Sequence, residues 1–439
     1  MRFGTDGVRG VANTALTPEF ALALGRAVAR VLNPGQVVVG MDTRISGPLL
    51  ESAFAAGLAC EGVDVLRLGV VATPAVAFVA ETLGAAGAMI SASHNPFADN
   101  GIKVFGVGGR KLADDVESAI EAQLVDLGAP TLSGSHVGRI MSATQYIDGY
   151  ETHVTDSLAG RRLDGLRIVV DAAHGSASPS AGRILRKLGA VVTEVGCSPD
   201  GININDHCGA THPAHLSAVV IELGAELGLA LDGDADRLIA VDENGATVDG
   251  DHIMAILARD MHERGTLRHD TVVVTVMTNL GFRQAMGAIG IAVIDTPVGD
   301  RYVLDALDAG GFCIGGEQSG HVILRDLAST GDGLLVGLAL CDVVRRSGRS
   351  LADLAASSMT QLPQVLVNVR LAEKDPTILD RLAPTIRMVE AELGANGRVL
   401  VRTSGTEPLL RVMVEAPTAN DANDAVLRII DALGSPKLQ

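Results

Sequence analysis

The sequence predicts an α/β fold made of three similar units followed by a smaller fourth domain. Short Val- and Ile-rich runs alternate with longer Ala- and Leu-rich segments of helical period, and the same order of parts recurs three times. At 439 residues the chain is also too long for one hydrophobic core. We therefore predict domains over residues 1–150, 151–250, 251–360 and 361–439.

The first unit opens with a helix whose local chemistry is favourable. Thr17 is placed to cap it, Pro18 takes the first helical position, and apolar residues then follow along one face. A strand at 37–39 runs into Asp42-Thr43-Arg44, and a second strand at 88–90 opens into the polar loop 91–96.

The second and third units repeat that order. In the second, a strand at 168–170 runs into a polar turn, and a strand at 229–231 opens into the acidic loop 232–237. In the third, strands at 272–274 and 312–314 precede the loop 316–321. Each unit therefore presents one loop rich in polar groups.

Two stretches do not follow this pattern. Residues 128–135 are rich in Gly, Pro and Ser and predict a loop or linker. Beyond Leu362-Pro363 three Val-rich runs, at 365–367, 399–401 and 412–414, predict a strand-rich fourth domain.

Composition excludes several classes of function. With 3% aromatic residues, no Trp, a formal charge of −17 and no run of Lys or Arg, the chain lacks the features of a nucleic-acid binder. No apolar stretch is long enough to predict a membrane span or a signal peptide. The five scattered cysteines indicate reduced thiols, so we expect a cytoplasmic location.

Three carboxylates alternate along the second polar loop, at Asp232, Asp234 and Asp236. An EF-hand is excluded because Arg237 stands where that loop needs glycine and because the flanks are strand-like. A Mg²⁺ ion held by few protein groups fits better, and a solvated acidic turn is the alternative.

The first polar loop offers Ser93 as a hydroxyl nucleophile or phosphoryl carrier, and Lys103 follows it closely. A lysine near a phosphoryl group can stabilise charge or exchange a proton. A serine in a loop is more often a simple turn residue, and a lysine is more often an exposed one.

Two further loops could bind ligand. The segment from Arg402 to Thr406 combines a guanidinium, hydroxyls and a glycine, which suits an anion cradle or a polar hairpin turn. It lacks the nucleotide P-loop pattern. The segment 316–321 sets Glu317, Ser319 and His321 among glycines, which suits sugar hydroxyls or a plain turn.

Together these four loops resemble the α-D-phosphohexomutase family over nearly the whole chain, in the expected order. The opening Phe3-Gly4-Thr5-Asp6-Gly7-Val8-Arg9-Gly10, the serine loop and the loop around Gln318 are similar to the branch that acts on glucosamine phosphates. Relatives acting on glucose or mannose phosphates often carry Met where this chain has Gln318. The resemblance implies mixed sheets in the three α/β domains, an α+β fourth domain and one central cleft.

The resemblance also implies roles for individual residues. Ser93 would be phosphorylated, with Mg²⁺, one ion per chain, bound by the three aspartates beside it. Lys103 would be a candidate for proton transfer. The remaining implied contacts are Arg9 and Arg237 near the phosphoserine, His321 near the sugar, Glu317 and Ser319 on sugar hydroxyls, and Arg402, Ser404, Gly405 and Thr406 on the phosphate that is not transferred.

The implied activity is that of an isomerase. It would interconvert glucosamine 6-phosphate and glucosamine 1-phosphate through glucosamine 1,6-bisphosphate and so supply UDP-N-acetylglucosamine synthesis. A phosphomannomutase/phosphoglucomutase and a sugar phosphatase are the alternatives. The implied partners are a phosphosugar and a kinase or bisphosphate donor that charges Ser93, with a homodimer as one option.

Two positions depart from the family pattern. Thr403 stands where the family commonly has Pro, which makes that loop less stiff. Pro297 stands where some relatives have Lys, and Arg301 is the nearby cation that could replace it.

Overall fold

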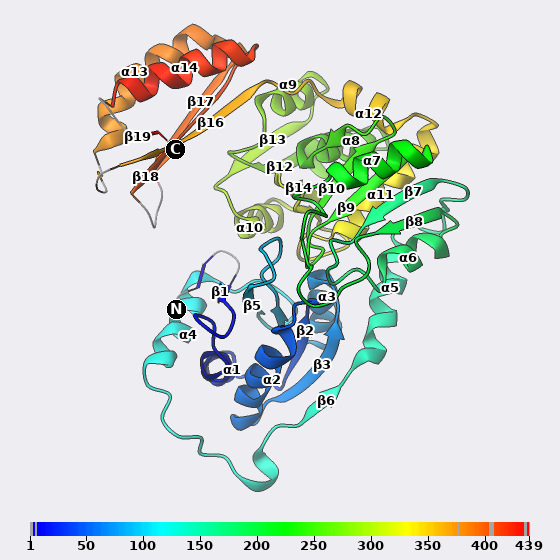
Figure 1. Cartoon of the computed structure of the whole chain (residues 1–439), viewed down its shortest axis with the longest axis vertical. Coiled ribbons are helices and arrows are strands. Elements are labelled where there is room, and N and C mark those ends of the chain that lie inside the picture. The colour runs from blue at the N-terminus through cyan, green and yellow to red at the C-terminus, as the bar shows by residue number, and fades with distance from the viewer. Residues whose placement is uncertain are drawn as a thin grey trace. The chain divides into compact units, whose positions relative to one another are not determined.

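The structure, a computed structural model, describes residues 3–4, 7–371, 373, 375, 377–403, 408–433 and 437–438. The chain forms two compact units (Figure 1). One comprises Met1–Met277 with Ile291–Ser358, and the other comprises Thr278–Gly290 with Met359–Gln439.

The first sheet has the strand order β1-β5-β4-β2-β3-β6. β3, β2 and β4 run parallel, and β5 returns antiparallel beside β4. Its strands are β1 Val8–Val11, β2 Gln36–Met41, β3 Asp64–Val70, β4 Ala86–Ile90, β5 Asp99–Phe105 and β6 Ile140–Ser142. Its helices are α1 Pro18–Leu32, α2 Gly47–Cys60, α3 Thr73–Leu83 and α4 Asp114–Val125.

The second sheet, ordered β11-β10-β9-β7-β8, repeats this arrangement. β8, β7 and β9 are parallel, and β10 is antiparallel to β9. The elements are α5 Ile147–Asp156, β7 Arg167–Asp171, α6 Ala181–Lys187, β8 Val191–Val195, α7 Ala214–Leu223, β9 Leu227–Leu231, β10 Leu238–Asp242 and β11 Thr247–Val248.

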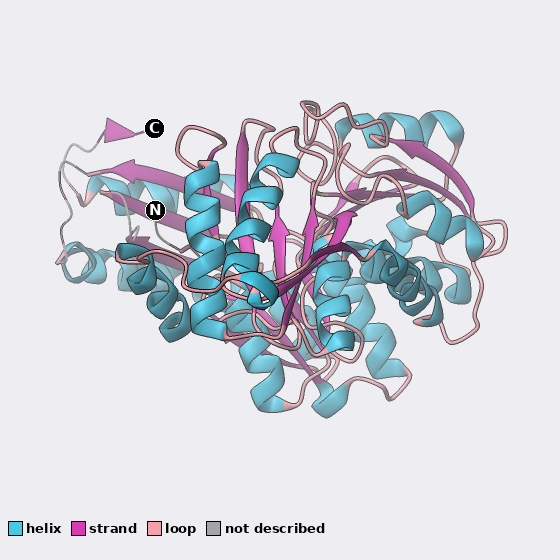
Figure 2. Ribbon diagram, turned by 90° about the horizontal axis from the view of Figure 1, so that it is seen from below, coloured by secondary structure: helices cyan, strands magenta, loops and turns pink. Residues whose placement is uncertain are grey.

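The third sheet, ordered β13-β12-β14-β15, repeats it again. β13, β12 and β14 are parallel and β15 is antiparallel to β14. The elements are α8 Gly250–Glu263, β12 Thr271–Thr275, β13 Ala292–Thr296, α10 Asp300–Gly310, β14 Ile314–Gly316, β15 Val322–Leu324, α11 Gly333–Ser347 and α12 Leu351–Ser358. Helices lie along the strands of these sheets (Figure 2).

The second unit has a purely antiparallel sheet, ordered β17-β18-β16-β19. Helices α13 and α14 pack on this sheet side by side (Figure 1). The elements are α9 Leu280–Ala288, β16 Gln364–Arg370, α13 Ile378–Leu393, β17 Arg398–Thr403, β18 Leu409–Glu415, α14 Ala419–Asp431 and β19 Lys437–Leu438. Single 3₁₀ turns occur at Gly134–His136, Thr144–Tyr146, Arg268–Asp270 and Gly394–Asn396.

The predicted fold class is confirmed, because three sheets share one strand order and a smaller antiparallel domain follows them. Thr17 caps α1, accepting a hydrogen bond from the Phe20 N–H at 3.2 Å. One strand position is corrected: β14 begins at Ile314 rather than at Phe312. Gly311 ends α10 in the left-handed conformation, and the Phe312 N–H still bonds the Leu307 carbonyl oxygen at 3.0 Å. The strand therefore cannot start before the chain has left the helix.

Strands β4 and β9 are buried at every residue, as expected for parallel strands covered on both faces. Their backbones are consequently fixed, and so are the loops that leave their carboxyl ends. Among the described residues, no helix is both long and apolar enough to cross a bilayer.

Helices α1 and α2 pack closely enough that glycine is required between them. A Cβ on Gly57 would lie 2.1 Å from the Leu22 carbonyl oxygen, which is a backbone atom that cannot swing away.

We expect Gly57→Ala to lower the stability of this unit by about 1–3 kcal/mol through overpacking. Gly149→Ala, in α5, is the matched control, because its Cβ would meet no atom closer than the Phe78 ring of α3 at 3.9 Å. The control should gain up to about 1 kcal/mol from helix propensity. Melting followed by circular dichroism compares the two, and equal midpoints would contradict the packing argument.

Candidate active site

The candidate site is built from equivalent loops of the three α/β domains. Each loop joins the last parallel strand of its sheet to the antiparallel strand that follows. The β4–β5 loop carries Ser93, the β9–β10 loop carries the three aspartates, and the β14–β15 loop carries Glu317, Ser319 and His321. The sequence repeat therefore corresponds to one structural position used three times.

Ser93 is held directly against the acidic loop. Its Oγ donates to Asp232 Oδ2 at 2.6 Å and lies 3.3 Å from His94 Nδ1. Its side chain is buried, and its backbone is left-handed with φ of 51°. Burial, followed by the nearby guanidiniums of Arg237 and Arg9, lowers the pKa of His94. The guanidinium groups of Arg237 and Arg9 therefore lie near Ser93. Such groups bind phosphoryl oxygens.

The three aspartates form one buried cluster. One carboxylate oxygen from each of Asp232, Asp234 and Asp236 lies within 4.8 Å of the others. Lys103, from β5 of the first domain, donates from Nζ to Asp234 Oδ2 at 2.6 Å and to Asp236 Oδ2 at 2.9 Å. Lys103, the predicted candidate for proton transfer, therefore contacts the predicted acidic loop directly.

The charges of this cluster are not evenly compensated. Burial and then the neighbouring Asp236 and Asp234 raise the pKa of Asp232 well above its ordinary value. For Asp236 burial acts in the same direction, but Lys103, His321 and Arg237 outweigh it and lower the pKa. Asp232, the carboxyl that contacts Ser93, is therefore difficult to ionise until more positive charge is placed beside it, and Lys103 contacts only the other two aspartates.

His321 links the third domain to this cluster. Its Nδ1 lies 3.7 Å from Asp236 Oδ1, and its Nε2 accepts a hydrogen bond from the Gly331 N–H at 3.1 Å. Burial alone would lower the pKa of His321, but Asp236 and then Asp300 raise it. Because Nε2 accepts from Gly331, the proton of the neutral ring lies on Nδ1, the nitrogen that faces Asp236.

A cavity of about 160 Å³ brings half of the predicted site residues together. It is also lined by Val298, Gly299 and Asp300, and the Gly299 N–H donates to Glu317 Oε1 at 3.1 Å. Ser319 does not line it but lies 3.5 Å from Glu317. The predicted residues in its wall are Arg9, Ser93, Lys103, Asp236, Arg237, Glu317 and His321.

The donor set suits a divalent cation. Asp234 Oδ1 is buried and has no hydrogen-bond partner, although Oδ2 of the same group is fully used. A buried carboxylate oxygen without a partner costs about 1–3 kcal/mol or more, and a hard cation would remove that cost. The residues placed to hold one are Asp232, Asp234 and Asp236, with Ser93 Oγ adjacent.

One of the residues predicted to bind the phosphate that is not transferred, Arg402, is described and belongs to the second unit. Ser404, Gly405 and Thr406 fall outside the described residues. Arg402 pairs across the sheet with Arg411, and burial followed by that like charge lowers the pKa of Arg402. Two neighbouring guanidiniums at a strand end favour an anion.

Of the two departures from the family pattern, Thr403 is the last residue of β17, and Pro297 lies four residues before Arg301. Arg301 forms an ion pair with Asp114 of α4 and does not line the 160 Å³ cavity. Gln318 donates from Nε2 to Asp249 Oδ2 at 3.3 Å, which anchors the third loop to the start of α8.

Sequence reasoning missed three residues that hold the site. Thr73 donates to Asp234 Oδ2 at 2.6 Å from the start of α3. Arg44 and Asn205 both donate to carbonyl oxygens of the serine loop. The Asp42-Thr43-Arg44 triplet after a buried strand was visible as a polar turn, but its target was not.

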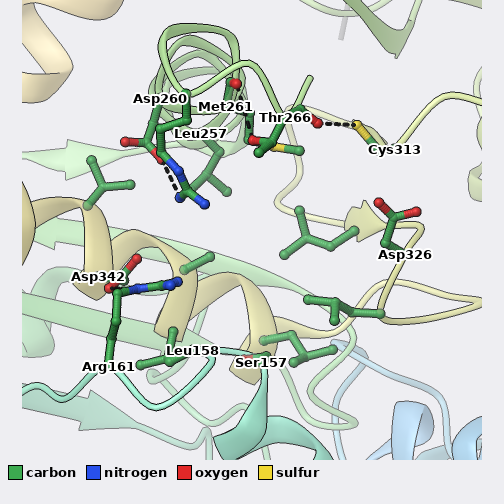
Figure 3. A pocket seen from close by; sticks show the side chains of 16 residues that line it. Ser157, Leu158, Arg161, Leu257, Asp260, Met261, Thr266, Cys313, Asp326 and Asp342 are labelled. Carbon is green, nitrogen blue, oxygen red and sulfur yellow. Dashed lines mark hydrogen bonds and ion pairs between the residues drawn. The ribbon is translucent and has the colours of Figure 1, made fainter. Parts of the chain in front are cut away.

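A larger cavity, of about 260 Å³, lies among α8, α11 and the chain after α5 (Figure 3). Four of its charged groups are paired with each other: Arg161 donates to Asp342 at 2.9 Å, and Arg264 to Asp260 at 3.1 Å. It contains no predicted site residue. We therefore assign the chemistry to the smaller cavity.

Comparison with known families covers nearly the whole chain. Profiles described as phosphoglucomutase/phosphomannomutase alpha/beta/alpha domains I, II and III match residues 1–128, 144–245 and 249–362. The profile of the C-terminal domain of the same family matches residues 366–432.

Individual relatives agree with these profiles. A phosphoglucosamine mutase of Streptomyces coelicolor is 53% identical over 99% of this chain and 98% of its own. A phosphoglucomutase/phosphomannomutase family protein of Burkholderia thailandensis has a TM-score of 0.82 at 26% identity, covering 99% of this chain and 98% of its own. An N-acetylphosphoglucosamine mutase of Aspergillus fumigatus, solved with GlcNAc-6P and magnesium, has a TM-score of 0.70 at 18% identity, covering 99% and 95%.

The unpartnered Asp234 Oδ1 predicts that a divalent cation stabilises the protein. At a hundredfold excess over its dissociation constant the cation should add about 2.7 kcal/mol. Asp234→Asn should remove most of that gain, because it takes away charge from the proposed ligand set while keeping the shape of the side chain. Asp206→Asn, at an exposed position of the same domain, is the control. Melting curves with and without MgCl₂ measure the shift, and an equal shift in all three proteins would argue against this site.

Proposed function

The chain belongs to the phosphoglucomutase/phosphomannomutase family, the α-D-phosphohexomutases, and from that premise we propose that it interconverts glucosamine 6-phosphate and glucosamine 1-phosphate. It is accordingly an isomerase that moves a phosphoryl group between two positions of one sugar. The amino sugar is favoured because a relative 53% identical over the whole length carries the name phosphoglucosamine mutase.

The observation that carries the proposal is the convergence of three loops on one cavity. A buried serine hydroxyl, 2.6 Å from a carboxylate, lies beside Arg9, Arg237 and Lys103. Such a set can hold a phosphoryl group on Ser93 and present it to a ligand in the cavity. Phosphoryl transfer relies mainly on positioning and on neutralising charge, and both are provided here.

In the proposed reaction phosphoserine 93 transfers its phosphoryl group to the free hydroxyl of the substrate. The bond between phosphorus and Ser93 Oγ breaks, a bond to the sugar oxygen forms, and the hydroxyl proton passes to a group of the cavity wall. Lys103 and His321 are the candidates for that group, and each would accept the proton in its neutral form. The product, glucosamine 1,6-bisphosphate, then turns around and returns its other phosphoryl group to Ser93.

We propose Mg²⁺ as the cation held by Asp232, Asp234 and Asp236, one ion per chain. When bound it supplies positive charge to the phosphoryl oxygens. Arg237 and Arg9 add guanidinium hydrogen bonds to the same group. Glu317, which lines the cavity, and Ser319, which lies beside Glu317, would form hydrogen bonds with sugar hydroxyls.

The phosphate that is not transferred is assigned to the fourth domain. Arg402, Ser404, Gly405 and Thr406 would hold it, and the like charge of Arg411 next to Arg402 supports an anion there. Because the phosphosugar must bind in two orientations, a cradle for either phosphate serves both halves of the reaction.

The partners that follow from this chemistry are few. A kinase or a hexose bisphosphate must first charge Ser93. A homodimer is compatible with the proposal but is not required by it. A cytoplasmic location is supported by the five cysteines, which are all free. The product would then enter UDP-N-acetylglucosamine synthesis.

A phosphomannomutase/phosphoglucomutase is the second candidate, since it would use the same serine and the same carboxylates. It is favoured by the likeness to the Burkholderia thailandensis protein, and only the identity of the preferred sugar separates the two. A phosphatase would instead release inorganic phosphate from phosphoserine 93 without isomerising the sugar.

Replacing Ser93 should abolish turnover. Ser93→Ala removes the oxygen that carries the phosphoryl group, so kcat should fall by at least ~10³-fold, equivalent to about 4 kcal/mol. Intact mass should show one phosphoryl group on the parent protein and none on the variant, while calorimetry should still detect binding of hexose 1,6-bisphosphate. A folded variant with full turnover would refute the role of Ser93.

Substrate preference tests the branch. With MgCl₂ and a trace of hexose 1,6-bisphosphate, kcat/KM for glucosamine 6-phosphate should exceed that for glucose or mannose 1-phosphate by about a hundredfold, or 2.7 kcal/mol. The reason is that a site built to hydrogen-bond an amino group leaves polar atoms unpaired when that group is absent. Preference for mannose or glucose phosphates would favour the second candidate, and phosphate release alone would favour a phosphatase.

A further inference from the structure

Two side chains from different domains grip the same two carbonyl oxygens of the serine loop. Arg44 Nη2 donates to the Ser93 oxygen at 3.1 Å and to the Asn95 oxygen at 2.5 Å. Asn205 Nδ2 donates to the same oxygens at 2.8 Å and 3.0 Å. We propose that Arg44 and Asn205 form a carbonyl clamp that positions Ser93 for phosphoryl transfer, an inference that rests on the function proposed above.

Ser93 needs such a support because of its backbone. A left-handed conformation costs a residue with a side chain about 1–2 kcal/mol, and it persists only where the surroundings impose it. At φ of 51° Ser93 directs its Oγ to Asp232, whereas its N–H donates to Ser91 Oγ at 2.9 Å. Because the carbonyl oxygens of Ser93 and Asn95 are both hydrogen-bonded, the backbone of the serine loop is held in this conformation.

The Arg44 half of the clamp is assembled within the first domain. Arg44 is fully buried, and its charge is balanced by an ion pair with Asp42. Asp42 also accepts from Ser91 Oγ at 2.5 Å, and Ser91 Oγ accepts from the Ser93 N–H. One connected set of hydrogen bonds therefore holds the serine loop against the end of β2.

The Asn205 half comes from the second domain. Its own N–H donates to the Ala173 oxygen at 2.9 Å, and its backbone is left-handed with φ of 59°. A Cβ on Gly233, the residue between two proposed cation ligands, would lie 2.6 Å from the Ser93 oxygen and 2.9 Å from Asn205 Nδ2. The clamp thus packs directly against the acidic loop.

Arg44 and Asn205 therefore have different roles. Arg44 shapes the serine loop within its own domain, and Asn205 fixes that loop relative to the carboxylates of the other domain. Neither side chain lines the cavity where the substrate is placed. Both are therefore positioning residues, and loss of the Asn205 half should slow the chemical step rather than weaken substrate binding.

Asn205→Gly tests the clamp, because glycine tolerates the left-handed backbone and lacks the side chain that carries the amide. Since a displacement of about 1 Å can cost about 100-fold, we expect kcat to fall about 10- to 100-fold with KM changed less than about threefold. Transfer from glucose 1,6-bisphosphate to dephosphorylated enzyme, followed by intact mass in a single turnover, should slow by the same factor. Asn33→Gly, at another left-handed asparagine at the end of α1, is the matched control and should equal the parent.

Asn205→Asp separates lost hydrogen bonds from lost volume. It keeps the shape and the tolerance for a left-handed backbone but has no N–H to donate, so it should be at least as slow as Asn205→Gly. Parent-like transfer in either folded variant would overturn the clamp, as would a fall in melting midpoint without a fall in kcat. Absence of transfer in the parent itself would instead refute the proposed function, and the clamp with it.

Discussion

The contact of Lys103 with Asp234 and Asp236 is the interaction on which the rest of the site depends. Three buried carboxylates from one loop repel each other, and Lys103 is supplied by a different domain. Breaking a buried ion pair by losing one partner costs about 3–5 kcal/mol. The first and second domains must therefore dock in one way, and that docking also brings Ser93 within hydrogen-bond distance of Asp232.

The repeated architecture explains why the site can be assembled from three domains. Each sheet ends its parallel part at β4, β9 or β14 and then turns back antiparallel. In each domain this turn follows a buried strand, and the turn itself carries the polar groups that could contact a ligand. Placing three such turns together joins the proposed phosphoryl carrier, the proposed cation site and the proposed sugar-binding loop without any change of the underlying fold.

Charge is arranged unevenly across the cluster, and the unevenness matches the proposed chemistry. Lys103 and His321 lie on Asp236, whose pKa is low, while Asp232 beside Ser93 has a raised pKa because burial and its neighbours leave it uncompensated. A cation belongs on the uncompensated side, where a phosphoryl group would also need one. The protein side chains thus define where positive charge is still required.

Much of the fold and of the candidate site could be predicted from the sequence, because short-range patterns carry that information. Alternation of apolar runs determined the strands, Thr17 and Pro18 determined the start of α1, and the residue types of each loop indicated a carrier, a cation site and a sugar contact. The tertiary structure alone decided which residues hold those loops. Arg44, Thr73 and Asn205 act on atoms far away in the sequence, two of them on carbonyl oxygens that every residue possesses. A backbone oxygen has no signature in a sequence, so only the docking of the domains could identify the groups that grip it.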